Sequence, residues 1–130
     1  MPRIYTFRGK TAEEMKNITK DQYLGLITSR QRRAIKRMSL GYRELLAKVE
    51  EAKKTGSDKP IRTHVREAVI LPDWLGRRFA VHTGKEYKDI AITEEMLGHR
   101  LGEYAFTTKR VQHSAPGIRA TRGSKFLAVK

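Results

Sequence analysis

The 130-residue chain has room for one small domain with a buried core. It carries 28 lysines and arginines against 14 acidic residues, and this net charge of +14 opposes a compact fold unless a polyanion neutralises it. The charge favours nucleic acid, an anionic membrane or an acidic protein as partner. The lack of cysteine excludes disulfides, thiolate zinc sites and a cysteine nucleophile. No apolar run could span a membrane and the start lacks a signal-peptide pattern, so we expect a soluble cytoplasmic protein.

Residues 1–37 are predicted to form a basic N-terminal extension with short helices. Thr11, Thr19 and Thr28 each stand three residues before a glutamate or glutamine, which is the capping-box pattern of a helix start. The segment 30–37, RQRRAIKR, holds five positive charges and no acid, so little of such a helix can be buried. It is interpreted as a phosphate-binding segment, with a solvated helix face as the alternative.

Residues 38–112 are predicted to form a globular domain. Apolar residues at 42, 45, 46, 49 and 52 share one helix face, so a helix is expected over 40–54, with a loop over 55–60. The β-branched run AVILP at 68–72 predicts a strand that its proline ends. Alternating apolar residues predict an antiparallel hairpin over 77–92 that turns at Thr83 and Gly84.

The rest of the domain is predicted to be short elements. Thr93 is expected to cap a short helix with acids in its first turn, and Gly98 stands where a left-handed residue ends a helix. Residues 104–108 are predicted to be a last strand or extended segment. The expected fold is therefore α+β, a small antiparallel sheet with a packed helix, followed over 113–130 by an extended basic C-terminal tail.

The motifs of common enzyme and metal sites are missing. The four histidines do not occur at metal-ligand spacing, and the chain contains no Walker loop, no dinucleotide-binding glycine motif and no nucleophile–base set. The sequence therefore predicts no catalytic residue, metal, cofactor or small-molecule substrate. Basic residues near aromatic rings are common instead, and they suit phosphates and unpaired bases. For Phe79 and Tyr87, on the predicted hairpin, a core role is an equal alternative.

We therefore expect the cations and histidines to form an RNA-binding surface. The predicted RNA-binding residues are Arg30, Arg32, Arg33, Lys36, Arg37, Arg62, His64, Arg66, Arg77, Arg78, Lys85, Lys88, His99, Arg100, Lys109, Arg110, His113, Arg119, Arg122 and Lys125. Gly98, Gly102 and Glu103 are predicted to build a structural junction, in which the glycines allow a tight turn and a close approach to RNA. Glu103 is expected to accept hydrogen bonds inside the protein, with a solvated carboxylate as the alternative.

Several linked motifs resemble the small-subunit ribosomal protein S-nineteen family. They are TGK at 83–85, LGHRLGEY at 97–104, most of the segment 59–85, and the tail sequence HSAPGIRATRGSKF at 113–126. The long N-terminal third and this tail resemble the archaeal and eukaryotic branch, and the length favours an archaeal source.

This resemblance implies a structural constituent of the small ribosomal subunit. It implies binding to the 3′ head domain of the small-subunit ribosomal RNA, with small-subunit protein S-thirteen and other head proteins as neighbours. It also implies that the tail points toward the tRNA-binding region, which makes tRNA a further candidate partner. The residues themselves leave a basic DNA-binding or chromatin protein as the alternative, although no zipper heptads follow the basic segment.

Overall fold

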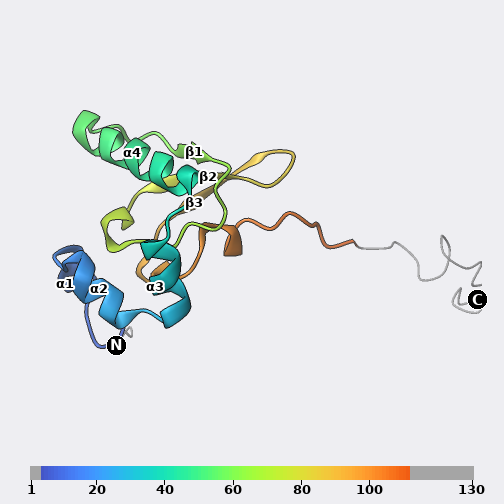
Figure 1. Cartoon of the computed structure of the whole chain (residues 1–130). Helices are drawn as coiled ribbons and strands as arrows, with labels where there is room; N and C mark the ends of the chain where they lie inside the picture. The colour runs from blue at the N-terminus through green and yellow to red at the C-terminus, as the bar shows by residue number, and fades with distance from the viewer. Residues whose placement is uncertain (1–3, 112–130) are drawn as a thin grey trace, which may run out of the picture.

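The structure, a computed structural model, describes residues 4–111 and contains helices and a small sheet (Figure 1). Residues 1–3 and 112–130, and with them the predicted tail, lie outside the described residues. The helices and strands are α1 (Ala12–Lys16), α2 (Lys20–Leu26), α3 (Ser29–Lys36), α4 (Leu40–Thr55), β1 (Ile61–Thr63), β2 (Arg78–His82) and β3 (Tyr87–Ala91). Single 3-10 turns lie at η1 (Pro72–Trp74), η2 (Glu94–Met96) and η3 (Leu101–Glu103). The predicted α+β class is confirmed.

The three short helices begin where the capping-box patterns predict. The backbone N–H of Thr11 donates to Glu14 at 2.9 Å, that of Thr19 to Gln22 at 3.3 Å, and that of Thr28 to Gln31 at 3.2 Å. Each pairing satisfies a donor that a helix start would otherwise leave free. Separate capping explains how such short helices follow one another without a long helical run.

Helix α4 is the long helix that apolar periodicity predicts. The Ser39 hydroxyl accepts the Tyr42 N–H at 3.3 Å, and Gly56 ends the helix with a left-handed φ of 62°. Tyr42, Leu45 and Val49 are buried on its inner face. That face joins the hydrophobic core that also contains the inward residues of β2.

The sheet has the order β1-β2-β3 and is mixed. Strands β2 and β3 form the predicted antiparallel hairpin, with Phe79 opposite Ile90. Strand β1 pairs with β2 in parallel, with Ile61 opposite Phe79, so the expectation of a wholly antiparallel sheet is wrong in this detail. A strand of three residues is too short to show alternation, which is why the sequence does not indicate β1.

The strand predicted over 68–72 is not found. Val69 makes only an isolated bridge with Arg100, and Ala68, Val69 and Ile70 are fully buried. Their backbone is paired with tyrosine side chains and with residues 99–101 instead of a neighbouring strand. The run is apolar because it is enclosed on all sides, a pattern that resembles a buried strand in sequence.

Two further predictions need correction near the C-terminal end. Residues 94–96 form a single 3-10 turn instead of a short α-helix, and the Thr93 side chain makes no capping hydrogen bond. Residues 104–108 contain no strand, and they are not extended throughout either, because the Tyr104 backbone has helical angles and Ala105 is buried in the core. Beyond Ala105 the chain is exposed and leaves the body of the molecule (Figure 1).

The hydrophobic core extends across residue 37, where the N-terminal extension is predicted to end. Met15, Tyr23 and Ile35 are buried in the same cluster as Trp74 and Phe79. Helices α1 to α3 therefore lie against the rest of the protein and hold their outer faces in fixed positions.

We expect Tyr23→Phe to lower the free energy of unfolding by about 1–2 kcal/mol, because the buried carbonyl of Ile70 loses its hydroxyl donor at 2.7 Å. Burial raises the pKa of Tyr23 and also that of Tyr42, whereas an unfolded tyrosine ionises near pH 10. The unfolded state therefore releases protons first as the pH rises, and the stability due to Tyr23 is lost above about pH 10.

This expectation is checked by urea unfolding at about pH 8 and about pH 11. The Phe variant should lose less stability between the two pH values than the unaltered chain, because it has one buried phenol fewer. Tyr5→Phe is the matched control, since Tyr5 is 41% exposed. Equal losses in all three proteins would contradict the assignment.

Candidate nucleic-acid interface

Helix α3 presents a continuous basic surface. Only Ile35 is fully buried in this helix, and its cations other than Arg32 are exposed. Together they line an open hollow of about 620 Å³ formed by Ser29, Arg30, Arg32, Arg33, Lys36 and Arg37. No acidic residue contributes to this lining, and the first turn of α3 contains no acid. An extended anion with several phosphates fits this arrangement.

Arg32 differs from its neighbours because it holds the fold. Its Nε donates to the carbonyl of Leu24 at 2.7 Å and its Nη2 to that of Ile27 at 3.2 Å. These carbonyls lie at the C-terminal end of α2, where helix acceptors lack partners and a positive charge is favourable. Arg32 therefore fixes the angle at which α3 leaves α2.

Arg66 also has its guanidinium engaged within the protein. It donates to the carbonyl of His82 at 2.8 Å, to that of Gly102 at 3.1 Å and to that of Ala105. The Gly102 N–H returns a bond to the Arg66 carbonyl at 2.9 Å. A Cβ on Gly102 would lie 3.0 Å from that carbonyl oxygen, so a side chain here would require the Arg66 backbone to shift by a few tenths of an ångström. Arg66 belongs to the predicted RNA-binding set, but in the structure it joins the sheet to the junction.

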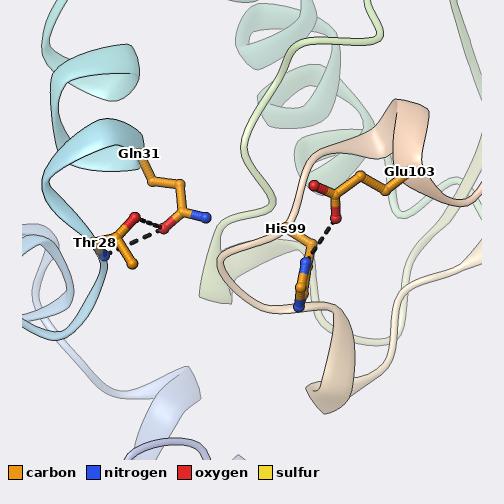
Figure 2. A network of polar contacts seen from close by, with 4 residues as sticks. All are labelled: Thr28, Gln31, His99 and Glu103. Atoms are coloured by element: carbon orange, nitrogen blue, oxygen red, sulfur yellow. Dashed lines mark hydrogen bonds and ion pairs between the residues drawn. The ribbon is translucent and has the colours of Figure 1, made fainter.

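The junction contains a short polar contact between His99 and Glu103 (Figure 2). His99 Nδ1 lies 2.6 Å from Glu103 Oε2, and both side chains are about half exposed. Gly98 adopts a left-handed φ of 77° and packs near Phe7 and Ile27. The carboxylate of Glu103 thus contacts His99 and is half exposed, so it is neither enclosed in the protein nor fully solvated. A partly exposed contact of this kind adds little stability, so its main effect is on ring orientation.

The Tyr104 ring lies edge-on to His99, with ring centroids 6.1 Å apart. Burial, followed by the charge of Glu103, raises the pKa of the Tyr104 hydroxyl. His99 is therefore held between a carboxylate and a ring, on the exposed side of the junction.

Rings and cations also gather where the sheet ends. His64 follows β1, His82 ends β2 and Tyr87 begins β3, and their rings lie within 4.2–5.6 Å of one another. Arg62 lies 5.4 Å from the centroid of the Tyr87 ring. On the other side of the hairpin, Lys88 lies 5.7 Å from the ring of Phe106.

The remaining predicted residues differ in how far their side chains are exposed to solvent. Arg77 and Arg100 are half-buried, and the Arg78 guanidinium donates to the carbonyl of Asp58 at 2.9 Å. The exposed members of the predicted set are Arg30, Arg33, Lys36, Arg37, Arg62, His64, Arg78, Lys85, Lys88, His99, Lys109 and Arg110. His113, Arg119, Arg122 and Lys125 lie outside the described residues.

Two features of this surface are not predicted from the sequence. His82 and Tyr87 are absent from the predicted site residues, although their places at facing strand ends of the predicted hairpin indicate that they lie together. Arg32 and Arg66 are predicted to act like the other arginines, because no local pattern marks an arginine that binds backbone carbonyls.

Over residues 4–111, no three histidine, aspartate or glutamate side chains gather as a metal ion would require. Within the same residues, no helix has the length and apolar character that crossing a membrane needs.

We expect Arg66→Gln to lower the free energy of unfolding by about 2 kcal/mol or more, because three carbonyls lose a charged donor. Arg33→Gln makes the same chemical change on the exposed face of α3 and should stay within about 0.5 kcal/mol of the unaltered chain. Urea unfolding of the three proteins measures the difference. A loss of equal size in both variants would mean that Arg66 has no special structural place.

Comparison with known proteins agrees with the resemblance noted in the sequence. Residues 33–113 match the model of the family described as Ribosomal protein S19. The chain is 47% identical over 128 residues to the small ribosomal subunit protein uS19 of Saccharolobus solfataricus, covering 97% of this chain and 91% of the relative. It is 40% identical to the protein of the same name from Metallosphaera sedula, with the same coverage. Both relatives are archaeal, as the sequence predicts. The chain belongs to the ribosomal protein S19 family.

Proposed function

We propose that this chain is a structural, non-catalytic protein of the archaeal small ribosomal subunit in the cytoplasm, and that it binds the 3′ head domain of the small-subunit ribosomal RNA. The observation that carries the proposal is the surface of α3, where cations line one open hollow without an acid. In the described part of the chain, the ion pairs involve Lys53 and His99 and none of these cations. Their charge is therefore available to phosphates.

The proposed RNA contacts are the exposed cations and histidines on α3, the sheet end and the junction, continued by the basic residues of the tail. Exposed cations can meet phosphate oxygens without breaking a contact that the fold needs. Arg32 and Arg66 are excepted, because carbonyls already occupy their guanidinium groups. Such contacts fix the position of a protein on RNA without reading its sequence.

The finer parts of the proposal concern the neighbours. The family resemblance supports small-subunit protein S-thirteen as a partner and a tail that reaches the tRNA-binding region.

Another part of the surface suits protein better than RNA. A hollow of about 500 Å³ is lined by Tyr5, Leu75 and Ile92, and its charged residues are Glu94, Glu95 and one cation, Lys16. Paired carboxylates would repel phosphates and attract a basic protein, which supports a protein neighbour on this side.

The DNA-binding alternative lacks a specific observation in its favour. Helix α3 has eight residues and a length of about 12 Å, and only residues 37–39 separate it from the start of α4. A helix that lies in the major groove presents several base-reading side chains along a protruding face. We therefore retain DNA only as a competitor in the binding test.

We expect the chain to sediment with the small subunit in high-salt gradients and to prefer a 3′-domain transcript of its ribosomal RNA over duplex DNA of equal length. Arg33→Gln should weaken RNA binding and reduce the slope of log affinity against log salt by about 0.7–0.9, the value for one phosphate contact. Glu51→Gln, at an exposed position of α4, is the control and should leave the slope unchanged. Equal affinity for DNA would contradict the proposal.

We expect deletion of residues 118–130 to leave subunit incorporation largely intact, because none of the buried core residues of the described chain is removed. The same deletion should weaken tRNA binding by the assembled subunit. Sedimentation measures incorporation and filter binding measures tRNA affinity. A truncated chain that fails to enter subunits would make the tail an assembly anchor instead.

A further inference from the structure

We propose that the three rings of His64, His82 and Tyr87 form a platform on which one unpaired RNA base stacks. This inference rests on the proposed function and assigns a specific ligand group, a single-stranded base, to one place on the protein. The rings come from three separate strand ends that the sheet brings together, since β1 is parallel to β2 and β2 is antiparallel to β3.

The geometry of the platform is that of a partial stack. The imidazoles of His64 and His82 lie 4.2 Å apart between centroids and are inclined by 31°. The Tyr87 ring stands nearly perpendicular to both, at 80° to His64 and 70° to His82. His82 thus covers one face of His64, and Tyr87 supports its edge. His64 is exposed and Tyr87 is 39% exposed, so the cluster belongs to the surface and not to the hydrophobic core.

The rings are fixed before any ligand arrives. The Tyr87 hydroxyl and His64 Nε2 are 2.9 Å apart, and the Gly84 N–H donates to His82 Nδ1 at 3.1 Å. The hairpin turn is closed by the Thr83 N–H, which donates to the Glu86 carbonyl at 2.8 Å. Below the rings, Arg66 holds the His82 carbonyl at 2.8 Å. Prior ordering of this kind reduces the entropy that a ligand must remove on binding.

The surroundings of the platform suit a nucleotide. Arg62 lies against the Tyr87 ring at 5.4 Å from its centroid, and Lys85 is exposed in the turn of the same hairpin. Rings that take a base, beside cations that take its phosphate, are the combination by which proteins hold single-stranded RNA. Bases within a duplex have both faces covered, so only a base from a loop, a bulge or a strand end can occupy the platform.

Two other roles for the cluster fit less well. A core role would bury the rings, and they are at the surface. A metal site would need further ligands near the two imidazoles, and no group of three such side chains occurs within residues 4–111. Binding of a protein by the same rings is a separate outcome, which the experiment below distinguishes.

The test measures the affinity of the full chain for a 3′-domain transcript of small-subunit ribosomal RNA over a range of salt concentrations. His64→Ala and Tyr87→Leu should each weaken binding by about 5-fold to 100-fold, the effect of losing one base–ring stack. The salt slope should stay unchanged because no phosphate contact is removed. Arg62→Gln, by contrast, should reduce the slope by about 0.7–0.9.

Matched variants keep the result interpretable if a ring helps the sheet to fold. Tyr5→Leu removes a ring of similar exposure elsewhere and should change affinity by less than about 2-fold. His64→Phe and Tyr87→Phe keep a ring at each position and should retain most of the affinity that His64→Ala and Tyr87→Leu lose. The double variant should lose less than the product of the single losses, because both rings serve one platform.

The inference is overturned if His64→Ala and Tyr87→Leu bind the transcript like the unaltered chain while Arg33→Gln still weakens binding. In that outcome the proposed RNA-binding function stands and the platform is free for another partner, such as a protein. If the unaltered chain does not prefer the transcript over duplex DNA, the proposed function itself fails, so the two failures are distinguishable.

Discussion

The fold depends on how residues 66–70, of which 68–70 are fully buried, satisfy their backbone hydrogen bonds. A buried carbonyl or N–H without a partner is strongly unfavourable, and this segment has no neighbouring strand along its length. The hydroxyls of Tyr23 and Tyr42 donate to the carbonyls of Ile70 and Val69 at 2.7 and 3.0 Å. The N–H of Ile70 donates to His99, and the carbonyls of Ala68 and Arg66 accept from residues 101 and 102. One segment therefore joins α2, α4 and the junction.

This arrangement decides where the cations lie. With α2 anchored to the central segment and Arg32 holding the end of α2, the burial of Ile35 leaves the remaining basic side chains of α3 outside. Arg66 reaches across the sheet end to the junction and holds the strand that ends at His82. Arg32 and Arg66 thus act inside the fold. Their hydrogen bonds hold the exposed cations of α3 and the rings at the sheet end in fixed positions.

Local patterns in the sequence predict local structure well here and fail where the structure depends on distant partners. Capping boxes and apolar periodicity give α1 to α4 and the hairpin, because each signal lies within a few residues. Strand β1 is not predicted, because three residues are too few to show a period. The run at 68–70 is wrongly predicted to be a strand, because its apolar character comes from its enclosure by the rest of the protein. The basic character of the candidate site is visible in the sequence. The division between Arg66, bound to carbonyls, and Arg33, free at the surface, appears only in three dimensions.

Helix α3 shows why this protein and a polyanion suit each other. Acids stand in the first turns of α1 and α2, where they balance the positive end of the helix dipole, but α3 has none there and carries Arg30 instead. Its cations also repel one another, so capping by Gln31 and burial of Ile35 must hold the helix against unfavourable electrostatics. Phosphates on this face would balance the positive end of the helix dipole and would also reduce the repulsion among the cations. Removing a single cation from α3 therefore has two effects: it weakens the attraction to RNA, and it lessens the repulsion within the free protein. For this reason RNA affinity and the free energy of unfolding need not change in the same direction.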